Sequence, residues 1–129
     1  MTLNGLLKIP YLANGRDRSG VDCYGGVRFA RYHLFGRGLM PDYTTVDGSD
    51  KRAMTEAMLS ESAGYHVVSR RAGAIATAWR GRLCVHVAIC VTIDGRLMIL
   101  EWDNDAPLPR LVHPSLFERQ YSRVVYYDN

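Results

Sequence analysis

The spacing of apolar residues is helical in the first half of the chain and strand-like in the second. Val27, Ala30 and Leu34 recur at intervals that place them on one face of a helix. Asp22 precedes this run and can act as an N-cap, because its carboxylate can accept hydrogen bonds from the free N–H groups of a first helical turn. The pattern therefore predicts a helix from Asp22 to Phe35.

Turn formers and caps organise the rest of the first half. A short helical or irregular lead-in ends at Pro10, which cannot continue a helix. Residues 11–20 are rich in Asn, Asp, Ser and Gly and are expected to form a loop. A second helix is predicted from Ser49, as its N-cap, to about Ser62, with Gly64 closing it.

The second half contains several strand-like segments. Their composition is typical of strands, and several are rich in Val and Ile. The predicted strands are residues 74–79, 83–93, 96 to about 102 and 122–127. Asp94 and Gly95 separate two of them, and this dipeptide is a strong signal for a two-residue hairpin turn. Residues 114–120 are expected to form one or two helical turns. Helices followed by a meandering antiparallel sheet indicate an α+β fold in a single domain over residues 1–129.

Composition and charge exclude several classes of protein. Hydrophobic residues make up 47% of the 129 residues and charged residues 22%, which is ordinary for a globular domain with its own core. The net charge is +3 with the signs interspersed, so no basic stripe predicts binding to nucleic acid. The apolar runs are too short for a membrane span, and residues 1–7 lack the pattern of a secretory signal. We therefore expect synthesis in the cytoplasm without a signal peptide, and no membrane partner.

The chain has three cysteines, an odd number without the spacing of a disulfide framework, which favours free thiols in a reducing compartment. Cys23 differs from the other two cysteines because it lies at the start of the helix predicted after the loop. In a first helical turn, unpaired N–H groups and the positive end of the helix dipole favour a thiolate. His86 lies in the predicted strand 83–93 and can act as a base. A helix-start cysteine with a strand histidine is the papain-like pairing.

The hairpin turn suggests where a third polar group lies. If Asp94 and Gly95 are the turn residues, His86 faces Asp103 directly across the strands, and Glu101 lies diagonally on the same face. Either carboxylate can hold the imidazole in the orientation that a general base needs. A bulge or a longer turn would shift this register, so Glu101 and Asp103 are joint candidates.

A metal site is a weaker interpretation of the same residues. Cys84 and Cys90 are an even number of residues from His86, so a regular strand would place all three on one face, as ligands of a zinc ion would require. Ligands on one strand without a second pair elsewhere in the chain favour packing in the core instead. The acidic residues 101, 103 and 105 are interpreted as one orienting carboxylate with solvated neighbours. We therefore expect no metal and no cofactor.

Two blocks of the chain resemble a known family. The first comprises Ile9-Pro10-Tyr11, Gly15-Arg16-Asp17, Gly20-Val21-Asp22-Cys23-Tyr24-Gly25 and Leu39-Met40-Pro41-Asp42-Tyr43. The second comprises His86-Val87-Ala88-Ile89, the hairpin, Leu97-Met98-Ile99-Leu100-Glu101 and the closing Val124-Val125-Tyr126-Tyr127. They are similar to the NlpC family of papain-like cell-wall cysteine peptidases, above all to the branch found in tail-assembly proteins of phages and prophages. The resemblance spans roughly residues 9–127.

This resemblance implies a papain-like fold, in which N-terminal helices carry the nucleophile and pack on a small antiparallel sheet. It also implies a hydrolase, a thiol protease that cleaves peptide stems of peptidoglycan, often beside a D-γ-glutamyl residue, without metal or cofactor. Cys23 would be the nucleophile, His86 the base and Glu101 the third polar residue. The residues on the substrate-binding side would be Tyr11, Asp22 and Tyr24.

The implied partners are peptidoglycan stems and other phage tail proteins, so the protein would act on the cell wall from a phage tail. Two departures from the family pattern support a second hypothesis, a catalytically silent tail-tip or assembly subunit. Gly26 stands where a bulky aliphatic residue is usual, and Glu101 is an uncommon third residue. A papain-like amidase or acyltransferase acting on another substrate is a third hypothesis, because the same dyad serves it.

Overall fold

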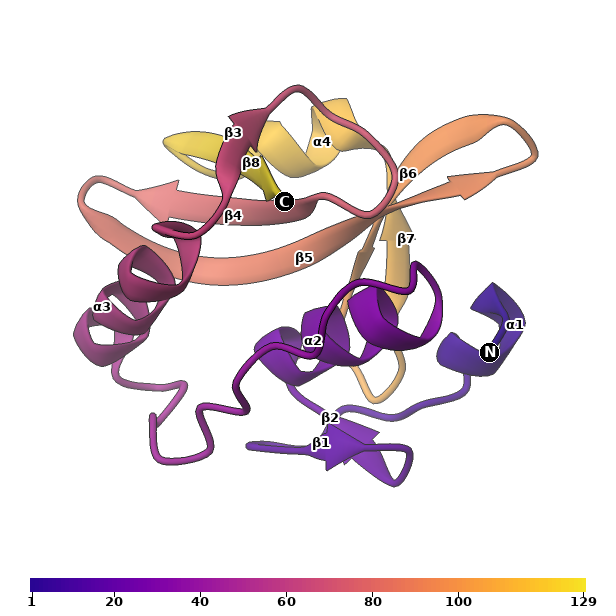
Figure 1. Ribbon diagram of the computed structural model, residues 1–129, viewed down its shortest axis with the longest axis horizontal. Coiled ribbons are helices and arrows are strands. Elements are labelled where there is room, and N and C mark those ends of the chain that lie inside the picture. Colours follow the sequence, from indigo (N-terminus) through magenta and orange to yellow (C-terminus); the bar gives the residue numbers. More distant parts are fainter.

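The structure, a computed structural model, describes residues 1–129 and has an α+β fold (Figure 1). The helices are α1 (Leu3–Leu6), α2 (Cys23–His33), α3 (Lys51–Ser62) and α4 (Pro114–Arg119). The strands are β1 (Arg16–Asp17), β2 (Gly20–Val21), β3 (His66–Val68), β4 (Ile75–Arg80), β5 (Leu83–Ile93), β6 (Arg96–Glu101), β7 (Arg110–Val112) and β8 (Arg123–Asp128). The expected combination of helices with an antiparallel sheet is confirmed.

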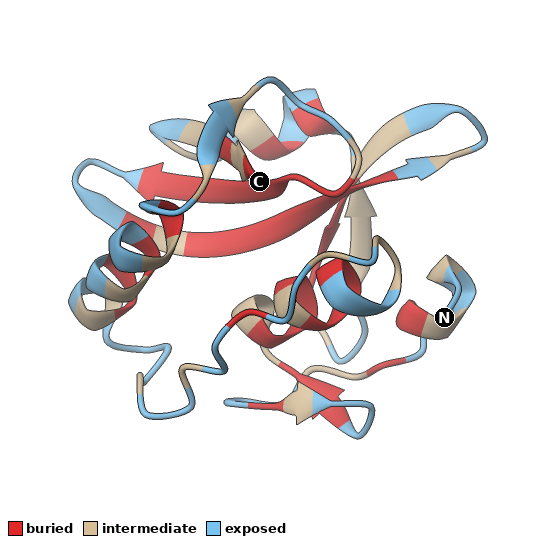
Figure 2. Cartoon of the chain, in the orientation of Figure 1, coloured by how far each residue is buried: buried red, intermediate tan, exposed pale blue.

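Six strands form one antiparallel sheet with a helical layer on each face. The strand order is β3-β8-β4-β5-β6-β7. Helices α2 and α3 pack through one hydrophobic core on one face, and Phe117 of α4 packs on the other face in a second core rich in alanine (Figure 1). The central strands β4 and β5 are therefore buried along most of their length (Figure 2).

The predicted hairpin joins β5 to β6 with the predicted register. Ile93 pairs with Arg96 on either side of the turn. Asp94 and Gly95 have φ angles of 50° and 77°, the left-handed values that a type I′ turn requires at both of its central residues. This dipeptide therefore sets the position of Glu101, at the end of β6, relative to the residues of β5.

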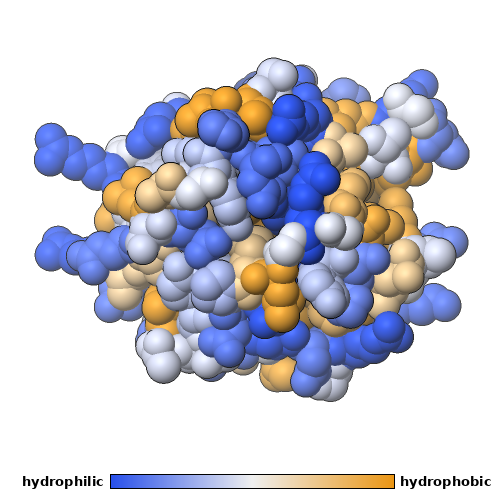
Figure 3. All heavy atoms as spheres, viewed as in Figure 1, coloured by the Kyte–Doolittle hydropathy of each residue, from blue (hydrophilic) through white to orange (hydrophobic).

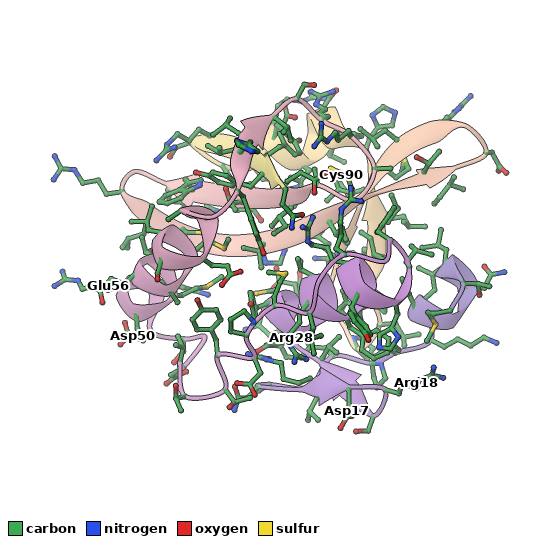
Figure 4. All side chains as sticks on the ribbon, in the orientation of Figure 1. Asp17, Arg18, Arg28, Asp50, Glu56 and Cys90 are labelled. Atoms are coloured by element: carbon green, nitrogen blue, oxygen red, sulfur yellow. The ribbon has the colours of Figure 1, made fainter.

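The sequence pattern does not predict the short strands β1, β2, β3 and β7. Strands β1 and β2 form a small hairpin inside the expected loop, and Asp17 and Arg18 project into solvent at its tip (Figure 4). Strands β3 and β7 are the two edges of the main sheet. Each of the four has only two or three residues, too few to show an alternating pattern.

The N-cap of α3 is Asp50 rather than the predicted Ser49. The Asp50 carboxylate accepts a hydrogen bond from the N–H of Ala53 at 3.1 Å. The Ser49 hydroxyl instead donates to Oδ1 of Asp47 at 2.8 Å, in the turn before the helix. The predicted N-cap of α2, Asp22, is confirmed.

A β-bulge at Val85 interrupts the alternation of β5, because the pairing with β4 shifts by one residue there. Cys84 consequently packs in the core beneath α2, whereas Cys90 packs in the core on the α4 side (Figure 4 labels Cys90). The expectation that both cysteines share a face with His86 is therefore wrong for Cys84. Both thiols are buried in cores, as expected.

Apolar side chains at the surface are dispersed. On the face seen in Figure 3, hydrophobic areas are small and separated by hydrophilic ones. The large exposed hydrophobic residues come from separate parts of the chain, among them Leu12, Leu39, Val67 and Leu116. None of the helices combines the length and apolarity needed to cross a membrane.

Candidate active site

Asp22 fixes the start of α2. Its Oδ1 accepts hydrogen bonds from the N–H of Gly25 (2.8 Å) and from Nη1 of Arg16 (2.7 Å), and its Oδ2 accepts one from the N–H of Asn14 (3.1 Å). Cys23 is the first residue of α2, as predicted. Asp22 therefore holds the thiol at a helix start, where N–H groups are unpaired and the dipole is positive.

His86 and Glu101 form a buried pair. Nε2 of His86 lies 2.7 Å from Oε1 of Glu101, and each residue is 4% exposed. The regular ladder between β5 and β6 ends at Leu100, so Asp103 lies beyond the paired strands and does not face His86 in a ladder. Of the two carboxylates predicted jointly, Glu101 bonds to the ring, while Asp103 has a carboxylate oxygen within 4.8 Å of both ligand atoms.

The charges around His86 raise its pKa to about 10. Burial by itself would lower this pKa, because it disfavours the charged ring. The neighbouring Cys23 thiol and the hydrogen bond with Glu101 outweigh burial, and the negative charge of Asp103 adds to their effect. The site therefore favours an imidazolium next to an anion, which is the charge state of a thiolate–imidazolium pair.

An open cleft of about 730 Å³ leads to Cys23 and His86. Tyr11 and Asp22, two of the three residues predicted on the substrate side, line it. Burial, followed by the charges of Cys23, Asp22 and Asp103, raises the pKa of Tyr11. The phenol is consequently protonated at neutral pH and offers a hydrogen-bond donor near the sulfur.

Tyr24, the third predicted residue, lines a separate small pocket of about 40 Å³ that is mostly apolar. Its hydroxyl does not point into free space but donates to the carbonyl of Pro41 at 2.7 Å. Four residues border both this pocket and the open cleft, namely Asp22, Cys23, Val46 and Gly48. The two spaces therefore adjoin each other along these residues, the thiol among them.

The connection from α2 to α3 forms one wall of the cleft, which the sequence reasoning missed. It runs back along α2 (Figure 1), and residues 44–49 line the cleft. The carbonyls of residues 40–42 accept hydrogen bonds, in that order, from Arg28 (2.7 Å), Tyr24 (2.7 Å) and Arg16 (2.5 Å). Tyr24 and Arg28 lie one turn apart in α2, but Arg16 comes from β1 and the acceptors lie beyond the helix, so no local pattern in the sequence signals this anchoring.

Gly26 has a packing role in the core. A Cβ at this position would overlap the six-membered ring of Trp102, which is 1% exposed and donates from Nε1 to the carbonyl of Ile9 at 2.9 Å. Trp102 directly follows Glu101, and Gly26 lies one turn after Cys23. The contact therefore sets the distance between the helix of the thiol and the strand of the carboxylate.

We expect Gly26→Ala to lower the free energy of unfolding by about 1–3 kcal/mol, because overpacking against the indole exceeds the helix-propensity gain of alanine. Urea unfolding followed by circular dichroism measures this change. Gly64→Ala is the matched control, since a Cβ there would meet only ordinary contact at 3.9 Å. A Gly26→Ala protein as stable as the wild type would contradict the packing role.

His86, Glu101 and Asp103 are the side chains whose arrangement could hold a metal ion, with ligand atoms within 4.8 Å of one another. The first two are bonded directly to each other, which accounts for their position without an ion. Cys84 and Cys90 lie outside this group, and burial raises the pKa of each thiol to about 12. Such thiols are inert in comparison with an exposed one.

Comparison of the chain with protein-family models, with curated proteins and with solved structures finds no match in any of the three. The function is therefore argued from the residues and their geometry.

Proposed function

We propose that the protein is a papain-like cysteine peptidase that hydrolyses peptide stems of peptidoglycan. The arrangement of Cys23, His86 and Glu101 carries this proposal. The thiol starts α2, it lines the same cleft as the ring and raises the pKa of that ring, and the carboxylate lies 2.7 Å from Nε2 of the ring. A nucleophile, a base and an orienting group in this order suit attack on an amide.

The chemistry assigned to the dyad has two steps. Sγ of Cys23 attacks the scissile carbonyl carbon, and His86 gives its proton to the leaving amine. A water molecule then attacks the acyl-enzyme while His86 takes up the proton, and the thiolate is regenerated. Glu101 holds the ring in one orientation and stabilises its positive charge in both steps.

Two donors are available for the negative oxygen of the tetrahedral intermediate. The N–H of Cys23 is the first of α2 and has no acceptor within the chain. The protonated hydroxyl of Tyr11 lies in the same cleft. We assign both groups to the oxyanion hole, where preorganised donors lower the barrier most effectively.

The choice of substrate is supported by the residues around Cys23, which resemble the NlpC family, and by the shape of the site. The cleft is open and polar along residues 44–49, which suits an extended peptide stem with charged groups. The same resemblance supports a place in a phage tail. The packing of Gly26 against Trp102 accounts for one departure that motivated the silent-subunit hypothesis.

The pairing of a Cys23 thiolate with a His86 imidazolium is tested by the pH dependence of alkylation with iodoacetamide. Mass spectrometry measures the reaction at each cysteine. We expect Cys23 to react fast well below pH 8.5, roughly where an ordinary thiol ionises, because His86 is held as an imidazolium beside it. In His86→Ala this advantage should disappear. Cys84 and Cys90 serve as internal controls, because both are buried with raised pKa values.

A Cys23 that reacts no faster than the two buried thiols would overturn the proposal. Glu101→Gln and Asp103→Asn form a matched pair of charge removals for the same assay. Glu101→Gln should shift the rate–pH curve of Cys23 toward that of His86→Ala, and Asp103→Asn should shift it less, since Glu101 alone bonds to the ring.

A further inference from the structure

The cleft contains a positive charge whose role the proposed dyad does not explain. Lys51, the first residue of α3, is half-buried and is the only Lys or Arg among the residues that line the open cleft. No carboxylate lies within 4 Å of its ammonium group. A cation held in a cleft without a partner is available to a ligand.

The acidic side chains of the cleft have other partners or lie elsewhere. Asp22 is paired with Arg16. Asp47 accepts two hydrogen bonds from Ser49, which lower its pKa, and the charge of Lys51 lowers it further. Asp103 belongs to the group around His86. Lys51 therefore influences the carboxylate of Asp47 but forms no ion pair with it.

Lys51 lines the same cleft as the proposed nucleophile. Burial raises the pKa of the Cys84 thiol, and the charges of Cys23 and Lys51 act on that same thiol in opposite directions. The N–H of Cys84 is bonded to the hydroxyl of Thr55, one turn after Lys51 in α3 (2.8 Å). Lys51 and Cys23 thus both border the cleft, and the charges of both act on the one buried thiol of Cys84.

We infer that Lys51 is a specificity residue that binds a substrate carboxylate close to the scissile amide. This inference rests on the proposed hydrolase function. A γ-linked acidic residue retains a free α-carboxylate a short carbon chain away from the carbonyl that Cys23 attacks, whereas the same residue with that carboxylate amidated has no anion there. Lys51 would therefore favour the free acid over its amide.

The first experiment compares alkylation of Cys23 by iodoacetate, an anion, and by iodoacetamide, its neutral counterpart. Lys51→Gln is expected to lower the ratio of the two rate constants by about threefold to tenfold, because a cationic side chain concentrates the anionic reagent. Lys51→Arg should keep most of the ratio. Arg52→Gln is the matched control, because Arg52 is the exposed neighbour of Lys51 and does not line the cleft. An unchanged ratio in Lys51→Gln would overturn the inference.

The second experiment uses peptide binding and does not depend on turnover. A Cys23→Ala protein is titrated by calorimetry with L-alanyl-γ-D-glutamyl-L-lysine and with the same peptide carrying D-isoglutamine. The free acid should bind about threefold to tenfold more tightly, and Lys51→Gln should remove this preference. Equal affinities for the two peptides would reject the inference.

The two failures can be told apart. A slow reaction of Cys23 with both reagents and no cleavage would reject the peptidase, while the ratio of alkylation rates and the affinities still report on Lys51. Fast, His86-dependent alkylation with an unchanged ratio would reject the role of Lys51 and leave the peptidase proposal intact.

Discussion

Cys23→Ala is expected to lower the hydrolysis of peptidoglycan stem peptides by at least about 1,000-fold, because no other group in the site can form the acyl-enzyme. The free energy of unfolding should change by less than about 1 kcal/mol, since the side chain is only partly buried at a helix start. Peptide cleavage measured by mass spectrometry, with a denaturation curve of the same sample, tests both expectations.

Cys90→Ala is the control for the loss of a thiol. Cys90 is buried on the α4 side of the sheet, so its removal should lower stability and leave hydrolysis unchanged. Hydrolysis that survives in Cys23→Ala would refute the peptidase proposal. If neither the wild type nor any variant cleaves a muropeptide, while the protein assembles with tail proteins, the silent-subunit hypothesis is the better one. Transfer products in place of hydrolysis products would favour an acyltransferase.

Asp128→Asn is expected to have the largest effect on stability. The Asp128 side chain is fully buried near the end of β8 and accepts from Nη1 of Arg31 (2.9 Å), Nη2 of Arg37 (3.0 Å) and Nε of Arg71 (3.0 Å). Arg31 is 1% exposed. Removing the one carboxylate leaves a buried guanidinium without its counter-charge, which costs about 3–5 kcal/mol. Chemical denaturation measures the loss, and Glu56→Gln, at an exposed residue of α3 (Figure 4), should change stability by less than about 0.5 kcal/mol.

The same carboxylate makes stability depend on pH. Burial alone would raise the pKa of Asp128, but hydrogen bonds from the three arginines hold it well below its usual range. Because the folded pKa is lower than the unfolded value of about 3.9, this stabilisation is present above about pH 4 and is lost as the pH falls further. Between pH 5 and pH 2 the free energy of unfolding of the wild type should therefore fall more steeply with pH than that of Asp128→Asn. The difference in slope should correspond to about one additional proton taken up on unfolding. Parallel curves would contradict this role of Asp128.

Much of the site was predictable because its determinants are local. The cap at Asp22 needs only a short polar side chain before an apolar helical pattern, and the turn at Asp94 needs only the following glycine. Together they place Cys23 at a helix start and bring Glu101 to the face of His86. The preference for Glu101 over Asp103 was not predictable, because it depends on where the ladder of β6 ends.

Other features depend on distant parts of the chain and leave no local signal. The bulge at Val85 separates Cys84 from the face of His86 and follows from the pairing with β4. The need for a glycine at position 26 arises from an indole at position 102. Short edge strands and the wall at residues 44–49 are likewise set by their neighbours in space rather than by their own composition.

The way in which residues 40–42 are anchored has a consequence for evolution. Their carbonyl groups, which every amino acid has, receive the hydrogen bonds from Arg16, Tyr24 and Arg28. Met40 is buried in the core, but the exposed side chains of Pro41 and Asp42 and those of the adjoining wall of the cleft can change without loss of the anchors. We expect variants of this domain to diversify in substrate preference along this wall while the dyad stays in place.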